Sequence, residues 1–145
     1  MISQTIGILK AFDTIHYEIL LSKLELYGFK GASLNLFRDY LSDRTQGTVI
    51  NNVKSETSRI RCGVPQGSIL SPLLLPLYIY DFPNFNPFSD VRMYADDTNL
   101  TFASSDPEEL FSSLTHDLSN LKQWLDSNRL SLNVLKTKCL FTGTR

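Results

Sequence analysis

The stretch Arg92–Leu100, RMYADDTNL, sets two adjacent carboxylates, Asp96 and Asp97, between two runs that favour β-strands. We predict a hairpin in which Val91–Tyr94 and Thr98–Phe102 are the strands and the carboxylates lie at the tip. Neighbouring like charges repel, and burying an unpaired carboxylate is costly. The pair is therefore either an ordinary exposed turn or a site for a divalent cation, since Mg²⁺ prefers carboxylate oxygens.

A second informative stretch, Cys62–Pro72, reads CGVPQGSILSP. Its glycines and first proline predict a loop. The pair Ser71 and Pro72 is typical of an N-cap followed by proline at the first helical position, which predicts a helix that runs towards Phe82. The loop is either an ordinary connection or a substrate-binding loop whose backbone a ligand can approach closely, with Gln66 supplying amide hydrogen bonds.

The third stretch, Leu9–Ile15, reads LKAFDTI and by itself favours a strand end followed by a helix that Asp13 caps. Elsewhere, apolar spacing and turn residues predict the remaining elements: a strand at 2–9, helices at Ile15–Tyr27 and Ala32–Leu41, two strands around a turn near Asn51–Ser55, a helix that starts at Asp106-Pro107-Glu108-Glu109 with an apolar stripe, and a β-segment at Cys139–Phe141. This irregular alternation indicates an α+β fold with an antiparallel sheet.

Composition narrows the class of protein. The chain has 145 residues, enough for one domain with a real core, and its longest apolar run, Ile69–Tyr80, is too short to span a bilayer. The N-terminus has no secretory-signal pattern. Cys62 and Cys139 lie far apart and only His16 and His116 accompany them, which argues against zinc and favours a reduced intracellular protein. The net charge of −1 gives no support for a self-sufficient nucleic-acid binder.

Taken together, AFD, GVPQGSILSP, YADD and the later WL..N.LSLN..KT run occur in an order and spacing that resembles the palm of reverse transcriptases of non-LTR (LINE-type, jockey-like) retrotransposons. The resemblance covers nearly the whole chain. It implies an α+β fold with a palm-like antiparallel sheet packed against helices. It also implies one partial reverse transcriptase domain over residues 1–145, with the fingers mostly absent and the thumb absent.

The resemblance also implies a metal site and its surroundings. Asp96 and Asp97 match two of the carboxylates that bind a pair of Mg²⁺ ions in nucleotidyl transfer. Tyr94 would lie beside the primer end. Lys136 matches a lysine that protonates the leaving pyrophosphate, and a solvated surface lysine remains an equally open interpretation.

Four further residues match positions that bind the incoming nucleotide in the family. Ala11 would offer a backbone N–H to the triphosphate, and Phe12 would crowd the sugar 2′ position. Gln66 and Gly67 would line the nucleotide and the template. The implied partners are an RNA template, a DNA primer and a dNTP. No membrane is implied, the family location is the nucleus or cytoplasm, and the oligomeric state stays open.

The chain departs from the family pattern where the first metal-binding aspartate belongs. The family's DLSKAFD reads GILKAFD here, so Gly7 replaces that aspartate, and we do not expect Asp13 to reach the metals instead. Pro76 inside a predicted helix and Tyr80 are further departures. We therefore expect at most weak Mg²⁺ binding and a truncated, catalytically impaired retrotransposon remnant. The alternative is a repurposed, non-catalytic RNA- or protein-binding module.

Overall fold

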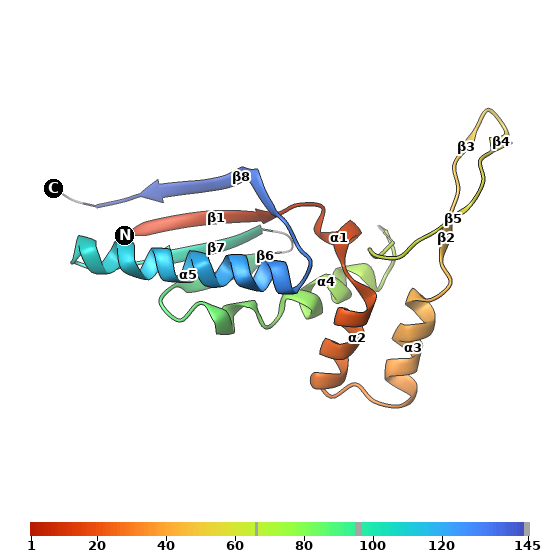
Figure 1. Ribbon diagram of the computed structural model, residues 1–145, viewed down its shortest axis with the longest axis horizontal. Coiled ribbons are helices and arrows are strands. Elements are labelled where there is room, and N and C mark those ends of the chain that lie inside the picture. The colour runs from red at the N-terminus through yellow and green to blue at the C-terminus, as the bar shows by residue number, and fades with distance from the viewer. Residues whose placement is uncertain (66, 95–96, 144–145) are drawn as a thin grey trace. The chain divides into compact units, whose positions relative to one another are not determined.

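A computed structural model describes residues 1–65, 67–94 and 97–143 of the chain (Figure 1). The chain divides into two compact units. We call Met1–Ala11 together with Ile79–Arg145 the sheet unit, and Phe12–Tyr78 the helical unit. Within the described residues, every helix is too short or too polar to cross a membrane.

The sheet unit is built on a four-stranded antiparallel sheet with the strand order β6-β7-β1-β8. Its strands are β1 (Ile2–Ile8), β6 (Asp90–Tyr94), β7 (Asp97–Phe102) and β8 (Leu132–Phe141). The predicted first strand and the two strands that flank YADD are confirmed, as is the α+β class. The last strand is longer than predicted because its pairing with β1 extends back to Leu132.

One face of this sheet carries the core of the unit. Alternate residues along β7, namely Thr98, Leu100 and Phe102, are buried. The helix α5 (Pro107–Ser127) buries Leu121, Trp124 and Leu125, and the Trp124 ring lies 5.0 Å from that of Phe82. The predicted apolar stripe of this helix is confirmed in its C-terminal half, whereas Leu110, Leu114 and Leu118 are only partly buried.

The start of α5 follows its sequence signals closely. The Asp106 carboxylate accepts a hydrogen bond of 2.9 Å from the Glu108 N–H, and Pro107 occupies the first helical turn. The capping box is completed through Ser104, whose hydroxyl donates to the Glu109 carboxylate (2.7 Å) and accepts from the Asp106 N–H (3.0 Å). The predicted helix start is confirmed.

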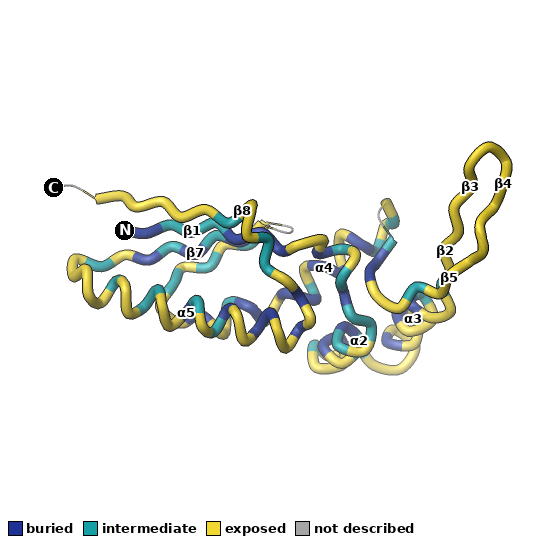
Figure 2. The backbone as a smooth tube through the Cα atoms, turned by 45° about the horizontal axis from the view of Figure 1, so that its top comes forward, coloured by how far each residue is buried: buried dark blue, intermediate teal, exposed yellow. Residues whose placement is uncertain are grey.

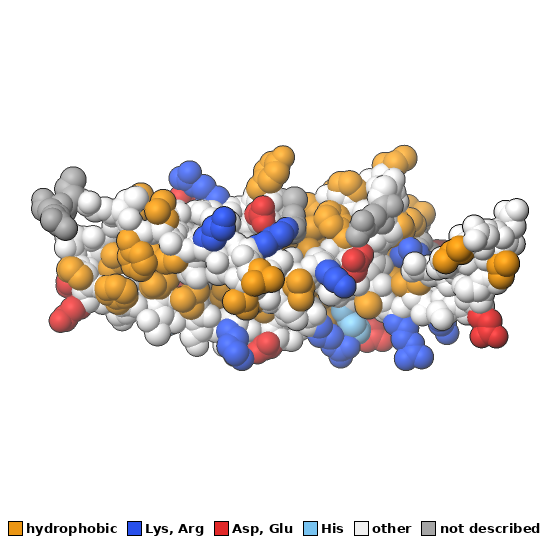
Figure 3. All heavy atoms as spheres, turned by 90° about the horizontal axis from the view of Figure 1, so that it is seen from above, with side chains coloured by type: hydrophobic (Ala, Val, Ile, Leu, Met, Phe, Trp, Pro, Cys, Tyr) orange, Lys and Arg blue, Asp and Glu red, His pale blue; other side chains and the backbone are white. Residues whose placement is uncertain are grey.

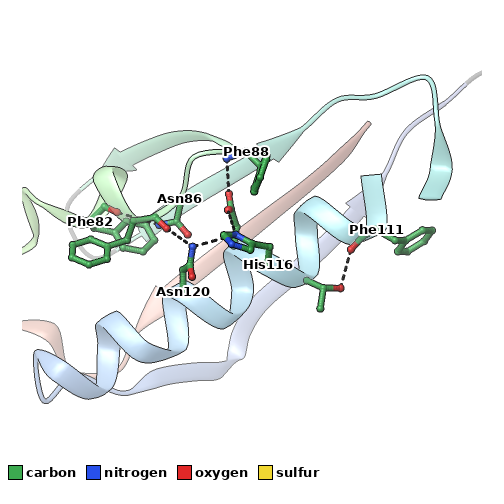
Figure 4. A network of polar contacts seen from close by, with 9 residues as sticks. Phe82, Asn86, Phe88, Phe111, His116 and Asn120 are labelled. Atoms are coloured by element: carbon green, nitrogen blue, oxygen red, sulfur yellow. Dashed lines mark hydrogen bonds and ion pairs between the residues drawn. The ribbon is translucent and has the colours of Figure 1, made fainter. Parts of the chain in front are cut away.

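Polar contacts tie the segment before β6 to the middle of α5 (Figure 4). This segment contains the 3₁₀ helix η1 (Phe82–Phe85). The Asn120 side-chain amide donates to the Phe85 carbonyl (2.7 Å), and the Phe88 N–H donates to the buried carboxylate of Asp117 (3.3 Å). These contacts hold the entry to β6, and so the strand that carries Tyr94, against the helix.

The helical unit contains the remaining helices: α1 (Ala11–Thr14, which starts at the last residue of the sheet unit's first segment), α2 (Tyr17–Leu26), α3 (Ala32–Leu41) and α4 (Ser71–Ile79, whose last residue belongs to the sheet unit). The prediction for Ala32–Leu41 is confirmed. The helix predicted to run towards Phe82 ends at Ile79, with Pro76 inside it. Leu20, Leu24, Leu74, Leu75 and Tyr78 are buried in this part of the chain.

The prediction that Ser71 caps α4 is wrong. The hydroxyl of a capping serine would accept a hydrogen bond from the Leu73 or Leu74 N–H. Both of these N–H groups instead donate to the Leu70 carbonyl (3.0 and 2.9 Å). The Ser71 hydroxyl is therefore available to donate to the Pro65 carbonyl, and the Ser71 N–H donates to the Ser68 hydroxyl (3.2 Å). The serine joins the helix start to the preceding loop.

A hairpin arm joins α3 to the GVPQG loop. Its strands are β2 (Thr45–Gln46) with β5 (Ser58–Arg59), and β3 (Val49–Ile50) with β4 (Val53–Lys54). Asn51 and Asn52 turn the chain with φ of 50° and 64°, as the tightest hairpin turns require. The two predicted strands around this turn are confirmed, each broken into two short pieces. The arm is exposed along its length (Figure 2).

Candidate active site

The strand register aligns the expected metal-site positions in one row across the sheet. Tyr94 pairs with Asp97, Asp97 pairs with Gly7, and Gly7 pairs with Asn133. Gly7 lies between buried Ile6 and Ile8, so its Cα–H faces away from the core, on the same face as Asp97. Cross-strand partners place their Cβ atoms about 4.5–5.5 Å apart. A side chain at position 7 would therefore lie directly beside Asp97.

Lys136 lies against this same glycine. The β8 strand shifts register opposite Thr5–Gly7, and the shift turns Lys136 back over β1. A Cβ atom at position 7 would lie 3.1 Å from the Lys136 Cβ and 3.3 Å from its Cδ. Within the bulge, the Lys136 N–H donates to the Asn133 side-chain oxygen (3.3 Å), and the Thr137 hydroxyl donates to the Asn133 carbonyl (2.9 Å). The structure thus brings the predicted lysine to the site of the predicted missing ligand.

Tyr94 and Asp97 are both open to solvent on this row. Tyr94 is 85% exposed, so its ring is free to contact a molecule that lies on this face. Asp97 is the first residue of β7 and is exposed. Asp96, the other carboxylate of the predicted pair, lies outside the described residues.

The described side chains do not by themselves make a two-cation site. Among residues 1–65, 67–94 and 97–143, no group of three or more His, Cys, Asp or Glu side chains is placed to hold a metal. In the row, Asp97 supplies a carboxylate, Gly7 supplies no side chain, and the Asn133 side-chain oxygen already accepts a hydrogen bond. Two divalent cations need more oxygen ligands than this.

In the helical unit, the AFD and GVPQG stretches are joined through their backbones. The Val64 N–H donates to the Phe12 carbonyl and the Gly63 N–H donates to the Ile15 carbonyl, each over 2.8 Å. Gly63 has a φ of +83°, and a Cβ atom there would lie 2.7 Å from the Asp13 carbonyl oxygen. Only glycine fits this position, because any side chain would meet backbone atoms that cannot turn aside.

Two side chains that the sequence reasoning missed hold the carbonyl of Gly63. The Tyr17 hydroxyl donates to it over 2.8 Å, and the Arg44 guanidinium donates to it over 3.1 Å. Burial raises the pKa of Tyr17, and the neighbouring charge of Arg44 partly opposes that rise. No local pattern marks either residue, since each acts on a loop far away in the sequence.

The other predicted nucleotide-binding residues have varied surroundings. Ala11 is buried at the first position of α1, which begins after a turn at Leu9 and Lys10 that follows β1, and Phe12 has intermediate exposure. Gly67 is exposed with a φ of +82°, and its position opens to empty space. Gln66 lies outside the described residues. The close approach of a ligand to the backbone at Gly67, expected from the sequence, is sterically open.

The two cysteines are not joined by a disulfide. Cys62 and Cys139 are both free and exposed.

Comparison with solved structures identifies the fold. The telomerase of Candida albicans, solved in complex with a fragment of telomeric RNA, superposes with a TM-score of 0.73 at 16% identity over 99% of this chain and 27% of that chain. Apo telomerase from Candida tropicalis gives a TM-score of 0.70 at 12% identity, over 99% of this chain and 31% of that one. At these identities the likeness concerns the fold alone, and it agrees with the predicted palm-like arrangement.

Comparison of sequences identifies the family. The chain is 33% identical over 135 residues to a probable RNA-directed DNA polymerase from transposon BS of Drosophila melanogaster, which covers 88% of this chain. It is 29% identical over 138 residues to the RNA-directed DNA polymerase from the mobile element jockey of the same species, which covers 90% of this chain. The chain spans 15% of the length of each of these relatives. The family model described as reverse transcriptase (RNA-dependent DNA polymerase) matches residues 3–144, and the chain therefore belongs to the reverse transcriptase family.

Proposed function

We propose that this chain is the palm part of a non-LTR retrotransposon reverse transcriptase whose nucleotidyl transfer is impaired by Gly7. The observation that carries the proposal is the register that pairs Gly7 with Asp97. An aspartate at position 7 would stand next to Asp97 and would supply a further carboxylate to the row. Glycine leaves that position without an oxygen ligand.

The family gives the proposal its chemistry. Reverse transcriptases generally use Mg²⁺, which activates the primer 3′-hydroxyl and stabilises the leaving pyrophosphate. We propose Asp96 and Asp97 as the remaining ligands, with weak binding at most, because divalent cations facing two carboxylates are incompletely neutralised. A lost metal ligand weakens stabilisation of the transition state, and each 1.36 kcal/mol of that loss costs a factor of about ten in rate.

The chain's own residues would place the substrates. Tyr94, exposed on the same row as Asp97, would pack beside the primer end. Lys136 would lie near the leaving pyrophosphate, because its stem lies against Gly7 beside the carboxylate row. Its ammonium group would donate the proton that the pyrophosphate takes up.

The nucleotide would meet the segments around α1 and the GVPQG loop. We propose that the Ala11 backbone N–H faces the triphosphate and that Phe12 limits space at the sugar 2′ position. The hydrogen bonds between Phe12–Ile15 and Gly63–Val64 support a joint role, because they hold the two motifs as one backbone framework. Gln66 and Gly67 would then line the nucleotide and the template.

The proposed substrates are an RNA template, a DNA primer and a dNTP. They rest on family membership and on relatives named as RNA-directed DNA polymerases, which are much longer than this chain. We propose that residues 1–145 form one partial reverse transcriptase domain.

A primer-extension assay tests the proposal. The chain is incubated with an RNA template, an annealed DNA primer, dNTPs and Mg²⁺, alongside its Asp97→Asn variant. We expect no incorporation above that of the variant. Clear incorporation by the chain that is lost in Asp97→Asn would refute the impairment, because it would show that the present ligands suffice.

A further inference from the structure

Three arginines that are separated in the sequence gather around one hollow in the helical unit. Arg38 at the end of α3 and Arg59 and Arg61 at the end of the hairpin arm line a cavity of about 280 Å³ together with His16, Glu18 and Asp43. We call this cavity the arginine hollow. Figure 3 shows basic side chains around a histidine on the face that it displays.

The charges of the hollow are incompletely paired. The Asp43 carboxylate is bonded to Arg59 over 2.7 Å. Arg38 has a long contact of 3.4 Å to the neutral Asn35 side chain, and Arg61 has no hydrogen bond or ion pair with any residue that the structure describes. Glu18 is then the one remaining carboxylate among the described residues that line the hollow, against two guanidinium groups. In a chain of net charge −1, this is a local excess of positive charge.

Guanidinium groups suit a phosphate ligand. The planar guanidinium of an arginine donates two parallel hydrogen bonds to phosphate oxygens, and it remains protonated at any working pH. Arg38 and Arg61 come from different elements and both line the hollow, so a phosphate bound there would meet two guanidinium groups.

Two further hollows adjoin the arginine hollow. Ile60, which lines it, also lines a hollow of about 440 Å³ at the base of the hairpin arm and a third of about 480 Å³ that reaches Gly63–Pro65. These spaces lie along the segment that leads directly into the GVPQG loop. A series of adjoining polar hollows suits a strand with repeated phosphates better than a single triphosphate.

We propose that the arginine hollow binds a backbone phosphate of single-stranded RNA, as the template strand continues away from the GVPQG loop. This inference rests on the proposed function, because that function assigns template contact to Gln66 and Gly67. It adds a specific phosphate contact, made by Arg38 and Arg61, which is independent of the site formed by Asp97 and Gly7.

The test measures RNA binding without catalysis. A fluorescently labelled single-stranded RNA oligonucleotide is titrated with the chain and with the Arg38→Gln, Arg61→Gln and doubly substituted variants, and anisotropy is recorded at several salt concentrations. The matched control is Lys30→Gln, which removes one positive charge from an exposed turn of the same unit outside the hollow. Thermal melting establishes that each variant is folded.

We expect each arginine substitution to weaken RNA binding about fivefold to tenfold, and the Lys30→Gln control by less than about twofold. The slope of log affinity against log salt should become shallower by about 0.7 for each phosphate that a variant no longer binds. Equal effects in the control and the arginine variants, or no RNA binding by the chain, would overturn the proposal.

A second arm separates the possible sources of the phosphate. The same variants are titrated with a dNTP. Loss of dNTP binding with RNA binding intact would make the hollow a triphosphate site and overturn the strand assignment. No step of this binding assay needs Mg²⁺ chemistry, so the result of the primer-extension assay does not affect it. If the chain extends primers but its arginine variants bind RNA as tightly as the unaltered chain, only the RNA-binding inference is refuted.

Discussion

Replacing Gly7 with aspartate tests directly whether the paired register creates a cation site. The new carboxylate would stand beside the exposed Asp97, with Cβ atoms about 4.5–5.5 Å apart, at a position where Gly7 itself is buried. Two unit charges at this distance repel by about 1–2 kcal/mol in a partly solvated site. Without a cation, we therefore expect Gly7→Asp to lower the melting temperature by about 2–6 °C.

Steric crowding would add to that loss. A Cβ atom at position 7 comes within 3.1 Å of the Lys136 Cβ, so the bulge in β8 must yield by a few tenths of an ångström. Such crowding costs about 1 kcal/mol. The variant Gly7→Asn meets the same Lys136 atoms without adding a charge, and it is therefore the matched control.

Mg²⁺ should then separate the two variants. A cation bound with a dissociation constant on the order of 1 mM, present at about 10 mM, stabilises the folded chain by about 1.4 kcal/mol. Melting curves are recorded in EDTA and in Mg²⁺, and we expect a rise of a few degrees in Gly7→Asp and little change in Gly7→Asn. Adding Asp97→Asn to Gly7→Asp should remove the rise.

Two results would refute this reasoning. If Gly7→Asn and Gly7→Asp respond equally to Mg²⁺, the charge at position 7 does not contribute to cation binding. If the unaltered chain already shows a rise as large as that of Gly7→Asp, Gly7 is not the defect of the site.

Three further predictions concern stability. Gly63→Ala should destabilise the chain by at least about 2 kcal/mol in denaturant unfolding, because its Cβ would meet the Asp13 backbone; Gly28→Ala, with a similar φ but open space around it, should cost about 1 kcal/mol. Asp106→Ala should cost about 1 kcal/mol in the same measurement, since the Glu108 N–H loses its acceptor. Because the pKa of Tyr17 is raised from its ordinary value near 10, its contribution to stability should be complete below pH 10 and lost as pH rises through the raised pKa, a dependence that Tyr17→Phe should abolish in pH-resolved melting.

Much of the sheet unit was predictable because its signals are local. The Asp106-Pro107 start of α5 and the strands on either side of YADD depend on residues within a few positions of one another. The Ser71 cap is predicted from the same kind of signal and is wrong, because the Leu70 carbonyl already accepts both N–H groups. A local pattern cannot report which acceptor the preceding loop brings to a helix end.

Residue types in a fixed order were enough to identify the family, the α+β class and the absence of a carboxylate at position 7. The folded structure was needed to show that Gly7 pairs with Asp97, that a bulge places Lys136 against Gly7, and that Arg38 and Arg61 line one hollow. Strand register and the meeting of distant segments arise from pairing across the whole chain, where a shift of one residue would turn every side chain of a strand to the other face. For that reason, the motifs could be recognised from the sequence, whereas the residues that lie beside them in space could not be predicted.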